Sequence, residues 1–185
     1  MGLSHGKEFT QEELDDYQIL TYLTKKEIYL AYKKFRALDP QKVSESKQNP
    51  LSMELVCTLP ELRVNPFGDR ICQVFSSTKD GRISFEDFLD MMSVFSDAAP
   101  ASVKLEYAFR IFDFDGDDLL SAQDLGEIIN RLVSPNYLLP AENTKLVGHL
   151  LEETDLDEDR ALSFAEFEHA VSKAPDFVRV FVIRL

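Results

Sequence analysis

The chain has 185 residues, of which 44% are hydrophobic and 14 are phenylalanine, so it can build a packed core and is not largely disordered. A formal net charge of −13 disfavours a nucleic acid as partner. No hydrophobic run approaches the length of a membrane span, and the first residues lack the apolar centre of a signal peptide.

The N-terminus leaves lipidation open. Removal of Met1 would expose Gly2, as N-myristoylation requires, but Gly6 stands where the usual pattern has Ser or Thr. A single myristoyl chain would give only weak, reversible membrane attachment. A basic stretch follows, made of Lys25, Lys26, Lys33, Lys34 and Arg36. It either faces solvent or contacts anionic lipid beside such a chain.

Helix starts recur along the chain. Each is a Ser or Thr followed three residues later by Asp or Glu, the spacing of a capping box. The pairs are Thr10 with Glu13, Thr24 with Glu27, Ser84 with Asp87, Ser121 with Asp124, and Ser163 with Glu166. Asn65-Pro66 predicts a further start, with Asn as the cap and Pro in the first turn.

The N-terminal half contains two weak copies of the twelve-residue calcium-binding loop of an EF-hand, whose positions are numbered from 1 to 12. The region 39–52 carries prolines and lysines between two helical patterns, so we interpret it as a degenerate loop with an insertion. The stretch 76–87 has Gly81 and Ile83 at loop positions 6 and 8 but no carboxylate at positions 1 and 3. We expect no useful metal site there. Cys57 and Cys72 form no Cys-x-x-Cys pair and are predicted to be buried, reduced thiols.

Two acidic stretches in the C-terminal half match the twelve-residue loop of an EF-hand. Such a loop binds a hard cation through oxygens at positions 1, 3, 5 and 12 and through the backbone carbonyl at position 7. The predicted ligands are Asp113, Asp115, Asp117, Leu119 and Asp124 in the first loop, and Asp155, Asp157, Asp159, Ala161 and Glu166 in the second. Apolar residues at helical spacing flank both loops, which favours a tandem pair of EF-hands.

The two loops differ in ways that affect the choice of cation. Both lack the usual Gly at position 6, where Asp118 and Arg160 stand, and Arg160 is expected to weaken its site more. Asp124 at position 12 is one methylene shorter than Glu166, so it is expected to give one oxygen and to let Mg²⁺ compete with Ca²⁺. We expect a mixed Ca²⁺/Mg²⁺ site around Asp113 and a more calcium-selective site around Asp155. The alternative is that one loop has lost metal binding.

These patterns predict an all-α EF-hand fold of four helix-loop-helix units in two lobes. Leu120 and Leu162, at loop position 8, are expected to form a short antiparallel β bridge. The predicted divisions are residues 1–97, an N-terminal lobe with two degenerate EF-hands, residues 98–175, a C-terminal lobe with two metal-binding ones, and residues 176–185, an apolar C-terminal segment.

Several segments spread over nearly the full length carry a resemblance. They include Leu-Pro-Glu-Leu-Arg-Val-Asn-Pro-Phe (59–67), Tyr-Ala-Phe-Arg-Ile-Phe-Asp-Phe-Asp (107–115) and Ala-Pro-Asp-Phe (174–177). With these segments the chain resembles the calcium- and integrin-binding protein family. The resemblance implies two degenerate N-terminal EF-hands, two metal-binding C-terminal ones and an Asp at position 12 of the third loop, and this chain matches all of these.

The resemblance also implies partners. Family members bind amphipathic segments of membrane proteins, such as integrin α cytoplasmic tails or transmembrane channel-like proteins, in a hydrophobic groove. The protein's own C-terminal segment can occupy that groove. Here residues 176–185 are too apolar to be left in water, so they fit that role or form a permanent part of the core. The expected location is the cytoplasm, with the inner face of the plasma membrane as a further option.

Three functions compete. We find no nucleophile–base pair, phosphate-binding glycine loop or zinc cluster, so an enzyme is not expected. The leading hypothesis is a metal-dependent adaptor or sensor that captures a tail helix. A calcium buffer would need only good loops. A constitutive regulatory subunit of an enzyme, similar in architecture to calcineurin B, would bind its enzyme tightly without metal.

Overall fold

A computed structural model describes residues 8–174, 177, 182 and 183. The helices are α1 (Gln11–Leu20), α2 (Lys25–Leu38), α3 (Pro40–Glu45), α4 (Met53–Val56), α5 (Pro60–Arg63), α6 (Gly68–Phe75), α7 (Phe85–Val94), α8 (Ala101–Phe112), α9 (Ala122–Val133), α10 (Pro140–Thr154) and α11 (Phe164–Ser172). The strands are β1 (Leu51–Ser52), β2 (Arg82–Ile83), β3 (Leu120–Ser121) and β4 (Ala161–Leu162). Among the described residues, no helix is both long enough and apolar enough to cross a membrane.

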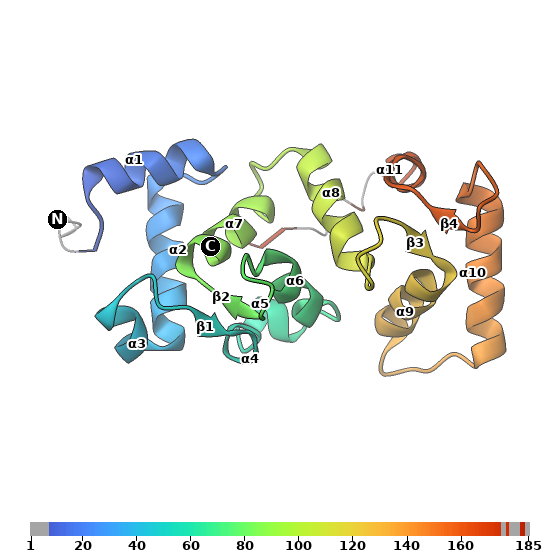
Figure 1. The fold of residues 1–185 in the computed structure, drawn as a ribbon, viewed down its shortest axis with the longest axis horizontal. Helices are drawn as coiled ribbons and strands as arrows, with labels where there is room; N and C mark the ends of the chain where they lie inside the picture. The colour runs from blue at the N-terminus through green and yellow to red at the C-terminus, as the bar shows by residue number, and fades with distance from the viewer. Residues whose placement is uncertain (1–7, 175–176, 178–181, 184–185) are drawn as a thin grey trace.

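Four helix-loop-helix units follow one another in two lobes (Figure 1). Hand I runs from α2 to α4, hand II from α6 to α7, hand III from α8 to α9 and hand IV from α10 to α11. The two strand pairs join loops within each lobe. Leu51 pairs with Ile83 in the N-terminal lobe, and Leu120 pairs with Leu162 in the C-terminal lobe, as predicted. The all-α EF-hand fold is therefore confirmed, whereas the boundary after residue 97 stays a prediction.

The five predicted capping boxes all begin helices. In each, the side chain of the cap accepts a hydrogen bond from the third helical N–H, and the acidic side chain accepts one from the N–H of the cap. The start expected at Asn65-Pro66 is wrong. Helix α6 begins at Gly68 after Phe67, because Asn65 Oδ1 instead accepts a hydrogen bond from the Phe67 N–H (2.9 Å) within a turn.

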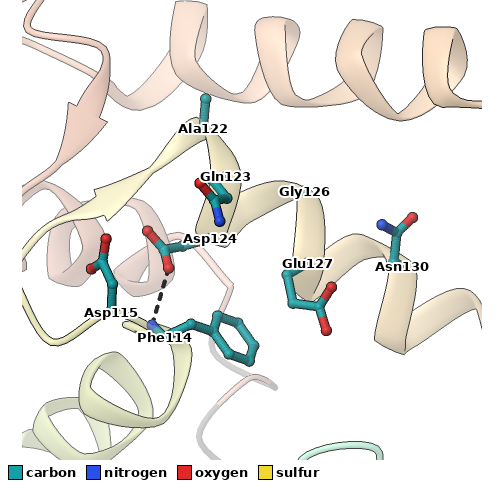
Figure 2. A pocket seen from close by; sticks show the side chains of 8 residues that line it. All are labelled: Phe114, Asp115, Ala122, Gln123, Asp124, Gly126, Glu127 and Asn130. Atoms are coloured by element: carbon teal, nitrogen blue, oxygen red, sulfur yellow. Dashed lines mark hydrogen bonds between the residues drawn. The ribbon is translucent and has the colours of Figure 1, made fainter.

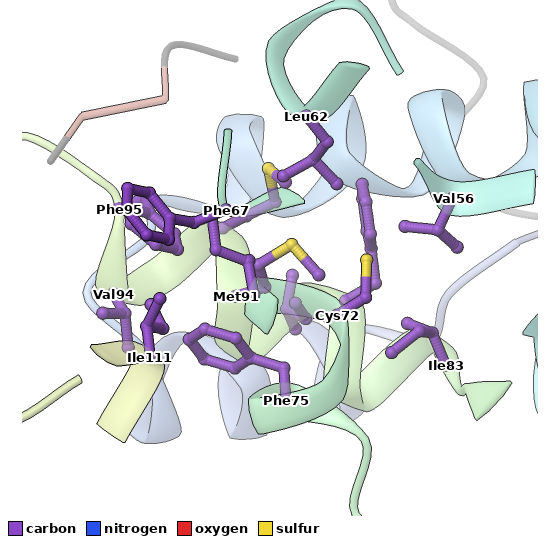
Figure 3. Close-up of a cluster of buried hydrophobic side chains, with 14 of the residues drawn as sticks. Val56, Leu62, Phe67, Cys72, Phe75, Ile83, Met91, Val94, Phe95 and Ile111 are labelled. Carbon is purple, nitrogen blue, oxygen red and sulfur yellow. The ribbon is translucent and has the colours of Figure 1, made fainter. Parts of the chain in front are cut away.

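A buried aromatic core fills the N-terminal lobe and continues into the C-terminal lobe. Phe35 on α2 contacts both Phe85 and Phe88 of α7, with ring centroids 5.7 and 5.3 Å away. Figure 3 shows the part of this core near α6 and α7, to which Ile111 of α8 also contributes. Helix α8 packs against α6 and α7 and carries Phe109 toward Phe167 of hand IV. One helix thus joins the two lobes.

The two cysteines are free, as predicted, and their Sγ atoms are 3.6 Å apart. Cys72 is buried and Cys57 is half-buried, so the prediction of two buried thiols holds for Cys72 and is wrong for Cys57. Burial raises the pKa of both thiols. At neutral pH the neutral thiols are therefore strongly favoured over the reactive thiolates.

The basic stretch on α2 is largely paired with the protein's own carboxylates. Lys25 pairs with Asp15, Lys34 with Glu61 and Arg36 with Glu8. Lys33 lies over the ring of Tyr29, with its Nζ 5.0 Å from the ring centroid. Because these charges already have partners, the arrangement argues against a lipid-binding face here.

Candidate metal centre and apolar groove

Loop III, between α8 and α9, gathers three of its predicted ligands. Three carboxylate oxygens lie within 4.8 Å of one another, one each from Asp113, Asp115 and Asp117. The buried Asp113 is held in place by backbone N–H donors, since Oδ1 accepts from Gly116 (2.7 Å) and Oδ2 from Asp118 (3.1 Å). Partial removal from water raises the pKa of Asp115, and repulsion from Asp117 raises it further. A bound cation would relieve that repulsion.

Loop IV, between α10 and α11, repeats this geometry. Oxygens of Asp155, Asp157 and Asp159 also lie within 4.8 Å of one another. Asp155 accepts hydrogen bonds from the N–H groups of Glu158 and Arg160, both at 2.8 Å. Such an oxygen-only donor set fits a hard divalent cation. The backbone carbonyls of Leu119 and Ala161, predicted as position 7 ligands, stay predictions.

The two position 12 carboxylates bind the loop backbone in the same way. In loop III, Asp124 accepts from the Phe114 N–H (3.0 Å, Figure 2) and from the Ser121 N–H (3.0 Å). In loop IV, Glu166 accepts from Leu156 (2.7 Å) and Ser163 (2.9 Å).

The Ser163 hydroxyl and these two N–H groups hold the pKa of Glu166 at about 2, so its carboxylate stays charged. Neither position 12 residue belongs to the three-carboxylate groups, and their direct contact with a cation stays a prediction.

Each of these loops, and loop II of the N-terminal lobe, has a left-handed residue at positions 4 and 6. The φ angles are 56° at Lys79, 74° at Gly81, 76° at Gly116, 67° at Asp118, 64° at Glu158 and 69° at Arg160. Loops II and III each place one glycine among these positions, but loop IV has none. Sequence reasoning identified the strain at position 6 and missed position 4. Loop IV is therefore the most strained of the three.

Loop II keeps the loop shape with hydrogen bonds in place of a cation. Ser76 at position 1 donates its hydroxyl to the carbonyl of Arg82 at position 7, at 2.8 Å. That carbonyl is the oxygen that a working loop presents to its metal. The internal bond, together with the missing carboxylates, supports the expectation that this loop binds no metal.

An apolar groove lies where the two lobes meet. It encloses about 580 Å³ and is lined by the α5–α6 corner, the end of α7, the last turn of α8 and the end of α9. Val64 at the corner is 78% exposed, and Leu132 on α9 is 62% exposed. Exposed, large apolar side chains around a hollow are typical of surfaces that bind a protein, a membrane or a ligand. The groove was predicted only from the family resemblance, and its lining residues were not.

Three described residues of the C-terminal segment lie in this groove: Phe177, Val182 and Ile183. The ring of Phe177 contacts Phe112 and Phe167, with centroids 6.4 and 6.0 Å away. The Ile183 N–H donates to the carbonyl of Phe95, at 2.7 Å. The other residues predicted for this segment lie outside the described part of the chain, as does Gly2.

Comparison with known proteins assigns the family. A family model for the EF-hand domain pair matches residues 102–172. Calcium and integrin-binding family member 2 of Drosophila melanogaster is 43% identical over 183 residues, which cover 96% of both chains. The human member 2 and member 3 proteins are 41% and 40% identical over 182 residues, again covering 96% of both chains. The chain therefore belongs to the calcium and integrin-binding family, as a calcium-binding regulatory protein with EF-hands and not an enzyme.

Proposed function

We propose that this protein is a metal-dependent adaptor that binds an amphipathic helix of a membrane protein's cytoplasmic portion in the apolar groove. The observation that carries the proposal is the groove itself, because hand III supplies part of its wall. Ile111 and Phe112 precede loop III directly, and Leu132 lies in the last turn of the helix that follows it. Metal binding that turns one helix of this hand would reshape the groove.

The relatives' name supports an integrin as the first partner to test, and we propose the α cytoplasmic tail as the segment that binds. Segments of transmembrane channel-like proteins are the second class that we propose. Phe177, Val182 and Ile183 already lie in the groove. A partner helix that displaces them has to bring a comparable apolar surface. We also propose that Mg²⁺ competes at loop III, through the short Asp124.

Such partners would place the protein at the inner face of the plasma membrane. A myristoyl group on Gly2 would add weak membrane affinity. Binding of the acylated and unacylated proteins to lipid vesicles tests this part of the proposal separately. Equal binding of the two forms would reject the lipid anchor and leave the tails of partner proteins as the means of membrane attachment.

The decisive experiment is calorimetric titration of an integrin α membrane-proximal tail peptide into the protein in Ca²⁺, in Mg²⁺ and in chelator. Binding that requires a cation supports the adaptor, and a response to Ca²⁺ alone makes it a calcium sensor. Metal-independent binding would favour a constitutive subunit. Absence of binding in all three conditions would reject integrin tails, and channel segments are then titrated in the same way.

Matched variants locate the peptide. Leu132→Asp should weaken binding by about 10- to 150-fold, because a buried leucine contributes about 1.5–3 kcal/mol. Ile19→Asp is the control, since Ile19 is 80% exposed on α1 and does not line the groove. Equal loss of binding in both variants would contradict binding in the groove.

A further inference from the structure

Two arginines from different hands contact one phenylalanine of loop III. Phe114 occupies loop position 2, where its N–H donates to Asp124. The guanidinium carbon of Arg70, on α6, is 5.1 Å from the centre of the Phe114 ring, and that of Arg131, on α9, is 4.9 Å from it. Cation–π contacts of this kind are attractive. They join loop III to α6 of hand II and to α9 of its own hand.

Arg70 binds the end of the helix that enters loop III. Its Nε donates to the carbonyl of Ile111 (3.2 Å), and its Nη2 donates to the carbonyls of Arg110 (3.3 Å) and Asp113. The last carbonyls of a helix lack partners within the helix, and a positive charge is favourable there. Hand II thereby fixes the position of Asp113, the first residue of the metal loop.

Arg131 attaches the helix that leaves loop III to the same corner of the N-terminal lobe. Its Nη1 donates to the carbonyl of Pro66 (3.1 Å) and to Asp69 Oδ1 (2.6 Å). Although partial burial alone would raise the pKa of Asp69, the hydrogen bond and charge of Arg131 hold it below its usual value. Pro66 and Leu132, the residue after Arg131, both line the groove.

Both helices of hand III are thus fastened to one short segment, residues 66–70, which forms a wall of the groove. A change in the angle between these helices has to move that wall or break the contacts of one arginine. We propose that Arg131 is a positioning residue that couples cation binding at loop III to the shape of the groove. This inference rests on the proposed function in one respect, that the groove is the partner site.

The coupling is reciprocal, so a partner in the groove should tighten cation binding at loop III by the factor by which the cation tightens partner binding. Such factors are typically about 5- to 150-fold. Arg131→Gln should reduce the factor toward one. Arg131→Lys keeps the charge but loses the planar fork, so it should restore the coupling only in part.

Hydrogen–deuterium exchange of the whole protein tests the coupling without any partner. Adding Ca²⁺ or Mg²⁺ to wild type should change exchange in residues 64–72 severalfold. In Arg131→Gln this response should disappear while amides of loop III still respond. Glu127→Gln is the matched control, because it removes the other carboxylate bound to Arg131 and leaves the contacts with Pro66 and Asp69.

The outcomes separate this inference from the proposed function. A segment 64–72 that does not respond to cations in wild type, or that responds equally in Arg131→Gln, overturns the coupling. If Arg131→Gln lowers thermal stability too far, Asp69→Asn tests the same contact by changing the carboxylate that Arg131 binds. The response of residues 64–72 to cations should then be lost as well. Peptides that fail to bind reject the adaptor proposal but leave the exchange experiment to decide on Arg131.

Discussion

Backbone strain at Arg160 gives a quantitative test of how loop IV binds calcium. Its φ of 69° lies in the left-handed region, where an L-residue costs about 1–2 kcal/mol relative to glycine. Arg160→Gly removes that cost wherever the loop has this conformation. If the loop adopts it only with bound Ca²⁺, the gain appears as affinity, about 5- to 30-fold. If the loop has this conformation in both states, the gain appears in the free energy of unfolding. That gain is smaller by about 0.4–1 kcal/mol, because glycine raises the conformational entropy of the unfolded chain.

The substitution also removes a positive charge beside three carboxylates, which by itself raises cation affinity. Arg160→Gln is therefore the matched control, because it loses the charge and keeps a side chain at positive φ. Calorimetric Ca²⁺ titration gives the affinities, and urea unfolding in chelator gives the stabilities. Asp118→Gly makes the same change in loop III, where a smaller effect is expected because Asp tolerates this region better.

The comparison between the Gly and Gln variants isolates the backbone contribution. Equal affinities together with equal stabilities would refute the claim that strain limits this loop. An affinity gain shared by both variants would assign the effect to charge. Glu158→Gly, at position 4 with a φ of 64°, should repeat the gain of Arg160→Gly within the same loop.

Three further predictions follow from the loops and helix ends. Chelation should lower the melting temperature by roughly 5–11 °C per site, since a cation at 100 times its Kd contributes about 2.7 kcal/mol; scanning calorimetry with and without EDTA measures this, and an unchanged melting temperature would argue against both sites. Asp124→Glu should raise the ratio of Ca²⁺ to Mg²⁺ affinity at loop III by about tenfold, because the longer side chain can supply one extra ligand oxygen to Ca²⁺. Competition titration measures this ratio. A ratio that does not move would show that the length of this side chain does not set the choice of cation. Gly68→Ala should destabilise by about 1–3 kcal/mol, because its Cβ would lie 2.4 Å from the Leu62 carbonyl oxygen, whereas Gly148→Ala inside α10 meets nothing within 4 Å and should stabilise by about 0.5–1 kcal/mol. Urea unfolding that gives both variants the same sign would contradict this.

The metal loops and helix caps could be predicted because their determinants are local. The cap of α9, for example, depends on Ser121 and Asp124, three residues apart, and the loop ligands alternate over a few positions. Local reasoning failed at Asn65-Pro66, where the same residue types serve a turn. It also missed the left-handed Glu158, because nothing in that side chain signals a positive φ.

The groove and its attachments could not be predicted in this way. Arg131 reaches the Pro66 carbonyl across 65 positions of the chain, and Arg70 reaches the Asp113 carbonyl across 43. Their partners are backbone oxygens, which every residue carries, so the sequence contains no matching signal. Only the packing of α8 against α6 and α7 brings them together.

The division between metal-blind and metal-binding hands gives the proposed adaptor a physical basis. Loop II is closed by its own Ser76–Arg82 hydrogen bond, so hand II keeps its loop shape without a cation of its own. Arg70 on α6 fixes the entry to loop III, whereas Arg131 lies on the helix that leaves it. In the proposed mechanism hand II supplies a wall of the groove without binding metal, and cations at loop III act on that wall through the contacts of Arg131. A calcium buffer would need neither this attachment nor the groove, and on this ground we favour the adaptor over the buffer.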